Sequence, residues 1–136
     1  MKSRDTLIRL KKFNVDEKRR RVAQIEAMVA EFDRMAVDLD REIAAEEQRS
    51  GISDVAHFAY PTYAKAARTR RDNLRRSADD LKTQLDEAQA ELGEAFEALK
   101  KVEILDNRER SAERAAEAAR EQSAMDNIGL ARAMRA

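Results

Sequence analysis

Few side chains in this sequence are suited to catalysis or metal binding, because His57 is the only histidine and there is no cysteine. No recognisable partner motif accompanies His57, and such an isolated imidazole is more often structural than a ligand. The acidic pairs Glu46-Glu47 and Asp79-Asp80 could support acid–base chemistry in a pocket, but they fall in segments typical of solvated helix faces. Phosphate-binding, nucleophile-elbow and zinc-protease motifs are absent. We therefore expect no catalytic residue, metal or cofactor, and expect that the protein is not an enzyme.

The segment SGISDVAHFAYPTYAKAA, residues 50–67, gathers both tyrosines and the only proline of a chain that is 4% aromatic. Its aromatic residues Phe58, Tyr60 and Tyr63 have two possible roles. They can cap the end of a helical pair and shield its last apolar layer. They can also form a binding face for a partner protein, because aromatic anchors concentrate binding energy. The sequence leaves both roles open.

A run of four basic residues, Lys18, Arg19, Arg20 and Arg21, is the second feature that could bind a partner. It can be a solvated face that pairs with acidic residues near Glu91, or a docking patch for an acidic partner or a phosphate backbone. A basic run before a heptad repeat also occurs in bZIP proteins. The run is short, however, and lacks a base-reading pattern, so we do not expect DNA recognition.

The composition indicates long helices that bury a narrow seam instead of a compact core. Charged residues make up 40% of the 136 residues, with three glycines and one proline. No apolar stretch approaches the roughly 18 residues of a membrane span, and the N-terminus has no secretory h-region. We expect a cytoplasmic protein.

Two segments carry apolar residues at the alternating 3-4 spacing of a coiled coil. The first seam is predicted at Ile8, Lys11, Val15, Lys18, Val22, Ile25, Val29, Phe32, Ala36, Leu39 and Ile43. The second is predicted at Leu74, Ala78, Leu81, Leu85, Ala88, Leu92, Ala95, Leu99 and Val102. The spacing predicts one hairpin over 1–136, with a helix at about 5–49, a hinge at 50–60, a second helix at about 61–127 and a frayed tail to 136. Asp5 is expected to cap the first helix and Ser50-Gly51 to end it.

The order of charges favours an antiparallel hairpin over a parallel dimer. Residues 1–21 are basic, 22–50 acidic, 64–82 basic and 83–100 acidic. A turn near residue 55 pairs residue i with about 110 − i, so each block faces the opposite sign. In a parallel homodimer each block would face its own sign. The second helix then extends past the start of the first, and we expect the protein to be monomeric by itself.

Four segments resemble the flagellar export protein FliJ family over nearly the whole chain. They are the opening DTLIRLKKFNVDEKRRRVAQIEAM, the aromatic pair Tyr60-Pro-Thr-Tyr63, the segment LKKVEILDNRER and the end EQSAMDNIGLAR. The last is similar to an E-Q-x-x-x-D-E-x-A-x-R tail, with Asn127 in place of the second acidic residue. The resemblance implies an all-α antiparallel coiled-coil hairpin similar to the central stalk of rotary ATPases.

The resemblance also implies partners and contact residues. Family members bind the hexameric flagellar export ATPase and promote its assembly and activity, and they contact the export gate membrane protein and unladen export chaperones. Carried onto this sequence, the ATPase contacts are Leu7, Leu10, Lys11, Lys18, Arg19, Arg20, Arg21, Glu121, Gln122 and Asp126. Gate or chaperone contacts are Phe58, Tyr60, Tyr63, Ala67 and Leu74. The protein would be cytoplasmic and peripheral to the membrane-embedded apparatus, without inserting into the membrane.

Two other functions fit a coiled coil. One is an arm that grips nucleic acid, which net neutrality disfavours because 27 basic residues are balanced by 27 acidic ones. The other is a generic dimeric scaffold, which a measurement of mass in solution would distinguish from a hairpin.

Overall fold

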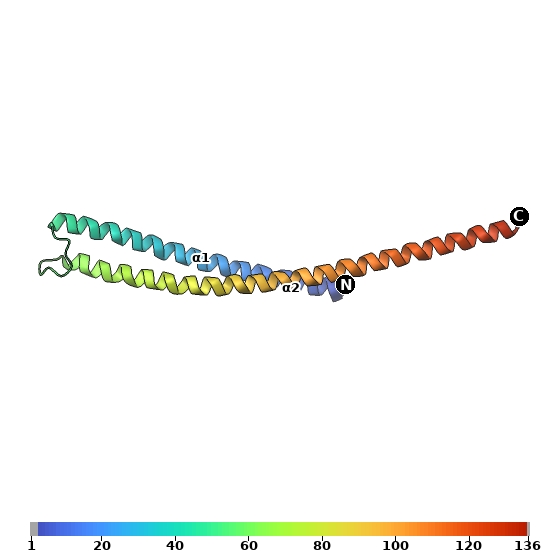
Figure 1. Ribbon diagram of the computed structural model, residues 1–136, viewed down its shortest axis with the longest axis horizontal. Coiled ribbons are helices and arrows are strands. Elements are labelled where there is room, and N and C mark those ends of the chain that lie inside the picture. Colours follow the sequence, from blue (N-terminus) through green and yellow to red (C-terminus); the bar gives the residue numbers. More distant parts are fainter. Residues whose placement is uncertain (1–2, 136) are drawn as a thin grey trace. The chain divides into compact units, whose positions relative to one another are not determined.

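The computed structural model describes residues 3–135, which form two helices joined by a loop. Helix α1 spans Ser3–Ser50 and helix α2 spans Thr62–Arg135, with the loop at 51–61 (Figure 1). The chain divides into two units, Val15–Glu94 and Met1–Asn14 with Ala95–Ala136. Each unit contains part of both helices, and the two are described separately below.

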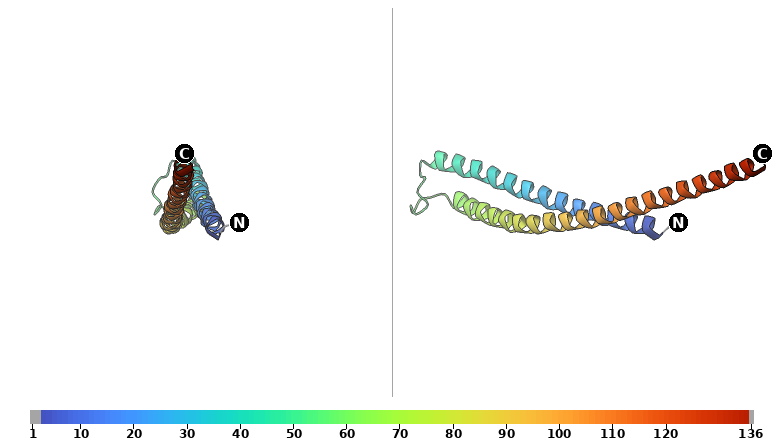
Figure 2. Two further views of the ribbon diagram at one scale, coloured as in Figure 1. Left: turned by 90° about the vertical axis from the view of Figure 1, so that its right-hand side faces the viewer. Right: turned by 45° about the vertical axis from the view of Figure 1, so that its right-hand side comes forward.

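In the unit Val15–Glu94, α1 and α2 run side by side in opposite directions from the loop, as the views in Figures 1 and 2 agree. The predicted seam is confirmed. On α1 the buried residues are Val15, Val22, Ile25, Ala36, Leu39 and Ile43, and on α2 they include Ala67, Ala78, Leu81 and Ala88. Small alanines of α2 meet larger residues of α1, because a short side chain lets the two backbones approach closely enough to enclose a large one.

The expected opposition of charge blocks is also confirmed within this unit. Lys18 Nζ lies 3.2 Å from Glu91 Oε2, and Arg71 Nη1 lies 2.9 Å from Asp40 Oδ1. Both pairs lie close to the predicted pairing of i with about 110 − i. These ion pairs agree with the antiparallel hairpin that the order of charge blocks predicts.

The ends of the helices at the loop follow from glycine and proline. Gly51 has φ of 74°, and its amide donates to the carbonyl of Glu47 at 2.9 Å, which ends α1 as predicted. Pro61 precedes α2, and its carbonyl accepts from the Lys65 amide at 3.1 Å. Proline suits this place because the first helical amides need no intrahelical partner.

Replacing Gly51 with Ala should destabilise the protein by about 1 kcal/mol, because a Cβ is strained at positive φ. No atom would obstruct the new methyl group, so the cost is conformational. Gly93 is the matched control: it lies within α2, and its added Cβ would also meet open space. Gly93→Ala should therefore stabilise by about 0.5–1 kcal/mol. Urea denaturation followed by circular dichroism measures both, and two shifts of the same sign would contradict this account.

The other unit contains the start of α1 and the second half of α2. Ala95 and Leu99 are buried, and Ile8 and Lys11 are half-buried across from them, so the seam phase continues. Asp5 lies in the first turn of α1 and not before it as the predicted cap, because the helix already includes Ser3. An acidic residue there still interacts favourably with the helix dipole.

After Val102 the seam positions of α2 become acidic instead of apolar. Asp106 is buried, and its Oδ1 lies 2.8 Å from Arg4 Nε of α1 as an ion pair. Arg4 also pairs with Glu109 and with Glu113, one and two turns further along α2. The hydrogen bonds to Glu109 and Glu113 raise the pKa of Arg4 above its ordinary value. The loss of apolar heptads after Leu105 thus marks a change from a hydrophobic seam to a charged one.

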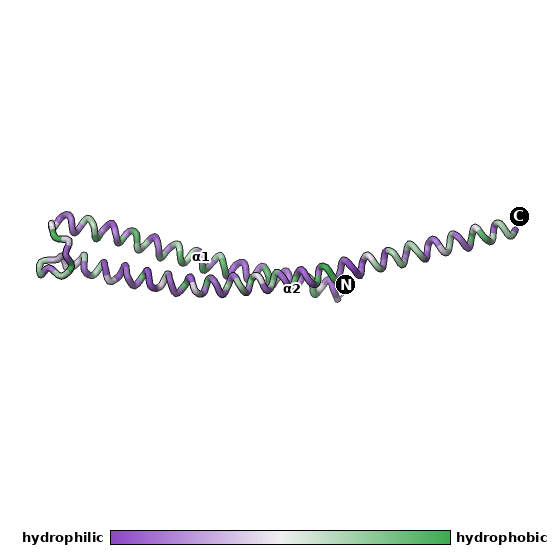
Figure 3. Tube along the Cα trace, in the orientation of Figure 1, coloured by the Kyte–Doolittle hydropathy of each residue, from purple (hydrophilic) through white to green (hydrophobic). Residues whose placement is uncertain are grey.

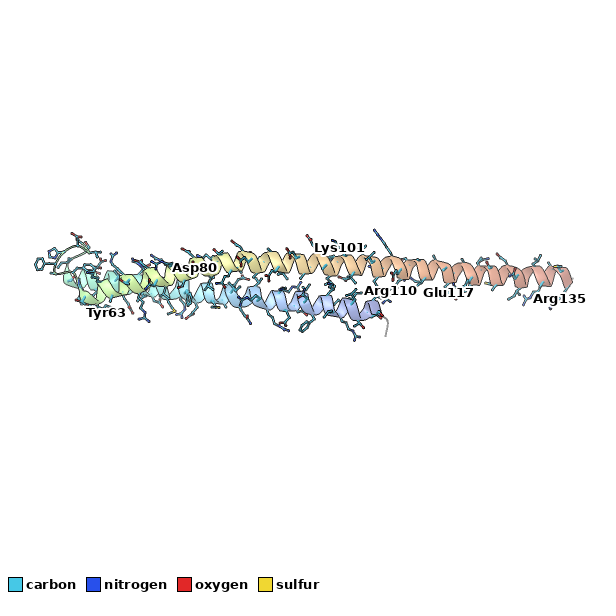
Figure 4. All side chains as sticks on the ribbon, turned by 90° about the horizontal axis from the view of Figure 1, so that it is seen from below. Tyr63, Asp80, Lys101, Arg110, Glu117 and Arg135 are labelled. Carbon is cyan, nitrogen blue, oxygen red and sulfur yellow. The ribbon has the colours of Figure 1, made fainter. Side chains whose placement is uncertain are left out.

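From residue 107 onward every described residue of α2 is exposed, including the two glutamates that pair with Arg4. Within this unit α2 passes the start of α1 at Arg110 and continues through Glu117 to Arg135 (Figure 4). The frayed tail predicted after residue 127 is wrong for 128–135, which are helical; Ala136 lies outside the described residues. Alanine and arginine favour the helix, and Arg132 and Arg135 in the last turn interact favourably with its dipole. These gains outweigh the cost of Gly129.

Apolar and polar residues alternate along both helices, without a long apolar run (Figure 3). None of the described helices is both long enough and apolar enough to cross a membrane.

Candidate functional site

Three polar side chains, those of Glu47, Tyr60 and Arg68, bond to one another where the helices meet the loop. The Tyr60 hydroxyl donates to Glu47 Oε2 at 3.0 Å, and Arg68 Nε donates to the Tyr60 oxygen at 2.9 Å. Arg68 Nη2 completes the triangle with Glu47 Oε2 at 3.1 Å. Because the Tyr60 ring is buried and its hydroxyl is satisfied, this residue has the capping role that the sequence left open.

Tyr63 lies one turn later on α2 and is 57% exposed. Its hydroxyl donates to Glu42 Oε2 of α1 at 2.8 Å. This hydrogen bond to a carboxylate raises the pKa of Tyr63 above its ordinary value, so the phenol stays a donor near neutral pH. The side chain thereby bridges the two helices while more than half of the residue stays exposed to solvent.

A groove of about 220 Å³ lies beside Tyr63, between α1 and α2. Its residues are Met35, Asp38, Leu39, Glu42, Tyr63, Arg70 and Leu74. The hydrophobic members come from the seam and its edge, and the charged members stand at the rim. We call this set the hinge-end groove. Apolar lining with a few placed polar groups is the chemistry of a site that receives a side chain of another protein.

The structure separates the five predicted gate or chaperone contacts into three groups. Tyr63 and Leu74 line the hinge-end groove together. Phe58 is 96% exposed in the loop, where its ring stacks on His57 with centroids 4.7 Å apart. Tyr60 and Ala67 are buried. Ala67 packs with Leu39 and Ile43, so it supports the groove from below and offers no surface of its own.

His57 has a structural role in the loop. Its Nδ1 accepts a hydrogen bond from the Ala59 amide at 3.0 Å, and its own amide donates to the Asp54 carbonyl. Asp54 Oδ1 in turn accepts from the Ala56 amide at 3.0 Å. These local bonds shape the turn that presents Phe58.

The predicted ATPase contacts lie in both units. In one unit Leu7 and Leu10 are exposed apolar residues of α1, and Lys11 takes a half-buried seam position. The predicted tail contacts of the same unit, Glu121, Gln122 and Asp126, are exposed on α2, and Gln122 Nε2 donates to Asp126 Oδ1 at 2.9 Å.

In the other unit the basic run consists of one lysine paired across the hairpin and three exposed arginines. Lys18 pairs with Glu91 across the hairpin, as the first of its two predicted roles required. Arg19 and Arg20 form ion pairs with Asp16 and Glu17 on their own helix, and remain exposed. Arg21 is exposed as well. Three arginines are thus available on the surface, and exposed ion pairs of this kind contribute little to stability.

Three groove residues were not assigned to a site from the sequence: Met35, Glu42 and Arg70. Each occupies the heptad position that flanks the seam on the Tyr63 side of the hairpin. A methionine at a flanking position that usually holds a charge was the available signal at Met35. The heptads leave the register of α1 against α2 uncertain by one helical turn. The sequence therefore did not show that Glu42 and Arg70 lie beside Tyr63.

The described residues hold no cluster of three or more histidine, cysteine or acidic groups arranged to bind a metal ion. A second depression, on the exposed part of α2, is lined by Arg110, Glu113, Arg114, Glu117 and Arg120. Since all five come from one solvated helix, it is a space between neighbouring side chains.

Comparison with known families gives one match: the model described as Flagellar FliJ protein matches residues 1–136. Neither the curated proteins nor the solved structures include a match to this chain. The family match covers every residue of the sequence. The chain therefore belongs to the flagellar FliJ family, and is a non-catalytic component of the flagellar export apparatus.

Proposed function

We propose that this protein is a cytoplasmic, stalk-like connector of the flagellar export apparatus, peripheral to its membrane-embedded part. In this proposal it binds the export ATPase ring through the unit that contains the start of α1, and promotes ring assembly and activity. It binds the export gate and unladen export chaperones through the hinge-end groove. The observation that carries the proposal is this groove, which is lined by the exposed aromatic residue Tyr63.

The chemistry of the groove suits a protein ligand. Leu39 and Leu74 give the groove an apolar lining. Tyr63 adds a rigid amphipathic ring, whose position is set by the hydrogen bond of its hydroxyl to Glu42. A preorganised aromatic side chain loses little conformational entropy on binding, so it is a favourable anchor. Arg70 at the rim offers a donor for a carboxylate or a carbonyl group of the partner.

The ATPase side of the proposal is supported by exposed apolar groups. Leu7 and Leu10 are exposed on α1, and Met125, Ile128 and Leu130 are exposed on α2. Tertiary contacts usually stabilise a helix, and in α2 the last ion pair with α1 that the structure gives is at Glu113, while 114–135 is exposed throughout. A receiving partner would supply such contacts.

Tyr63→Ala should weaken binding to the cytoplasmic part of the export gate, or to an unladen chaperone, about tenfold or more. Helicity should be unchanged, because the ring is mostly exposed and contributes little to the seam. Titration calorimetry with each purified partner measures the affinity, and circular dichroism checks the fold. Lys65→Ala, in the same turn of α2 and also exposed, is the control and should bind normally. Equal affinities for wild type and Tyr63→Ala would exclude the groove as the docking site.

A further inference from the structure

The two sides of the seam in the unit Val15–Glu94 differ in chemistry. On one side, acidic residues of α1 pair with basic residues of α2 once in every heptad. The pairs are Asp33 with Lys82, Asp40 with Arg75 and Glu47 with Arg68. The charged side chains on this side are already paired with one another. Few of them are therefore free to bind a helix of a partner protein.

The opposite side is neutral along its centre. With 100° per residue, Met28 and Met35 of α1 and Ser77 and Gln84 of α2 flank the seam there. The hinge-end groove confirms this geometry, because Met35 lines it together with Tyr63 of α2. Met28 is 46% exposed one heptad away. We call the set Met28, Met35, Ser77 and Gln84 the methionine face.

The edges of the methionine face are acidic. They carry Glu31 and Asp38 on α1 and Asp80 and Glu87 on α2. Figure 4 labels Asp80. Arg34, on the outer surface of α1, pairs with both Glu31 and Asp38. Arg41 also approaches Asp38, at 3.7 Å.

On α2 the two carboxylates have no such neighbour. Asp80 and Glu87 are exposed and form no ion pair with any residue of the described chain. The edge positions of the methionine face carry four acidic residues, and Arg70, one heptad before Ser77, is the basic residue that lies beside Met35 in the hinge-end groove. A basic partner would supply the missing counter-charges.

We propose that the methionine face binds one amphipathic helix of a partner, with apolar residues against Met28 and Met35 and basic residues against Asp80 and Glu87. The inference rests on the proposed function, since it identifies the form in which the gate or chaperone docks. A helix fits because the two methionines are one heptad apart, a spacing that an apolar stripe on a third helix matches. Methionine is flexible and polarizable, so it adapts to the residues it meets.

Designed peptides of 21 residues test the inference with the full-length protein. Each has leucine at heptad a and d positions, and the flanking positions are lysine in one peptide and glutamate in another. A third is a scramble of the lysine peptide that has no apolar stripe. Fluorescence anisotropy at low and high salt should show binding of the first peptide, weakened by salt, and at least tenfold weaker binding of the other two.

Two pairs of variants locate the site. Met28→Gln with Met35→Gln should weaken the lysine peptide about tenfold, while Val37→Gln should not. Val37 is the matched control because it is as exposed as Met28, at 46%, but lies on the other side of α1. Asp80→Asn with Glu87→Gln should lower the affinity and its salt dependence. Asp79→Asn with Asp86→Asn, on the other side of α2, should change neither.

Several outcomes would overturn the inference. One is equal binding of the lysine and glutamate peptides, and another is binding that ignores the methionine pair. Dimerisation of the free protein that Met28→Gln with Met35→Gln abolishes would identify a second copy as the occupant instead. Loss of gate and chaperone binding in Tyr63→Ala, without peptide binding to wild type, would leave the proposed function standing and reject the helix. Peptide binding without any gate or chaperone binding would reject the proposed function instead.

Discussion

Replacing Ile25 with Ala should lower the free energy of unfolding by about 3 kcal/mol. Ile25 is 1% exposed, the largest fully buried side chain of the described residues. It packs in a cluster with Val22, Leu81 and Ala88. A two-helix seam is one layer thick, so the surrounding side chains have little freedom to fill the space that the lost atoms leave.

Urea denaturation followed by circular dichroism measures this loss. Val37→Ala is the control, because Val37 is an exposed branched residue of the same helix. It should change stability by less than about 0.5 kcal/mol. If both substitutions destabilised the protein equally, helix propensity would be the source of stability, and the seam would not.

Leu7→Asp combined with Leu10→Asp should reduce stimulation of the export ATPase to the level seen without this protein. The two leucines are exposed on one turn of α1, and apolar anchors of this kind contribute most of the energy at protein interfaces. Two carboxylates in their place would have to be desolvated on binding, which is unfavourable. The measurement is ATP hydrolysis by the ATPase encoded in the same genome, together with its state of assembly.

Val55→Asp is the control for this prediction. Val55 is as exposed as Leu7, at 41%, but it lies in the loop of the hairpin. It should stimulate the ATPase normally. Full stimulation by the double variant would contradict the assignment of the ATPase contact to this turn, while a folded protein that fails with both variants would indicate a contact that includes the loop.

The charged seam formed by Arg4, Asp106 and Glu109 favours one register of the two helices, which the apolar pattern by itself does not. Apolar layers are interchangeable, so a coiled coil made of them alone can slip by one heptad. The buried Asp106 carboxylate penalises other registers, because slippage would remove its ion pair with Arg4 of α1. Asp106 also accepts from Arg110 Nε at 2.9 Å, which satisfies its second oxygen.

Much of this protein is determined by local pattern. The heptads identify Val22, Ile25 and Leu81 as seam residues, and Gly51 as the end of α1, because helix period and glycine conformation act over a few residues. The order of charged blocks also selects the antiparallel arrangement. Blocks of opposite charge still face each other when the register is wrong by a turn. The antiparallel arrangement could therefore be predicted without knowing the register accurately.

Only the tertiary structure decided which residues near the loop are buried as a cap of the hairpin and which are exposed on its surface. Tyr60 and Tyr63 are three residues apart and look alike in the sequence, yet one is buried against Glu47 and the other lines a groove with Met35. Their difference depends on the rotation of α2 about its axis and on its register against α1. Those two quantities are set jointly by the packing of both helices, and no single helical pattern contains them.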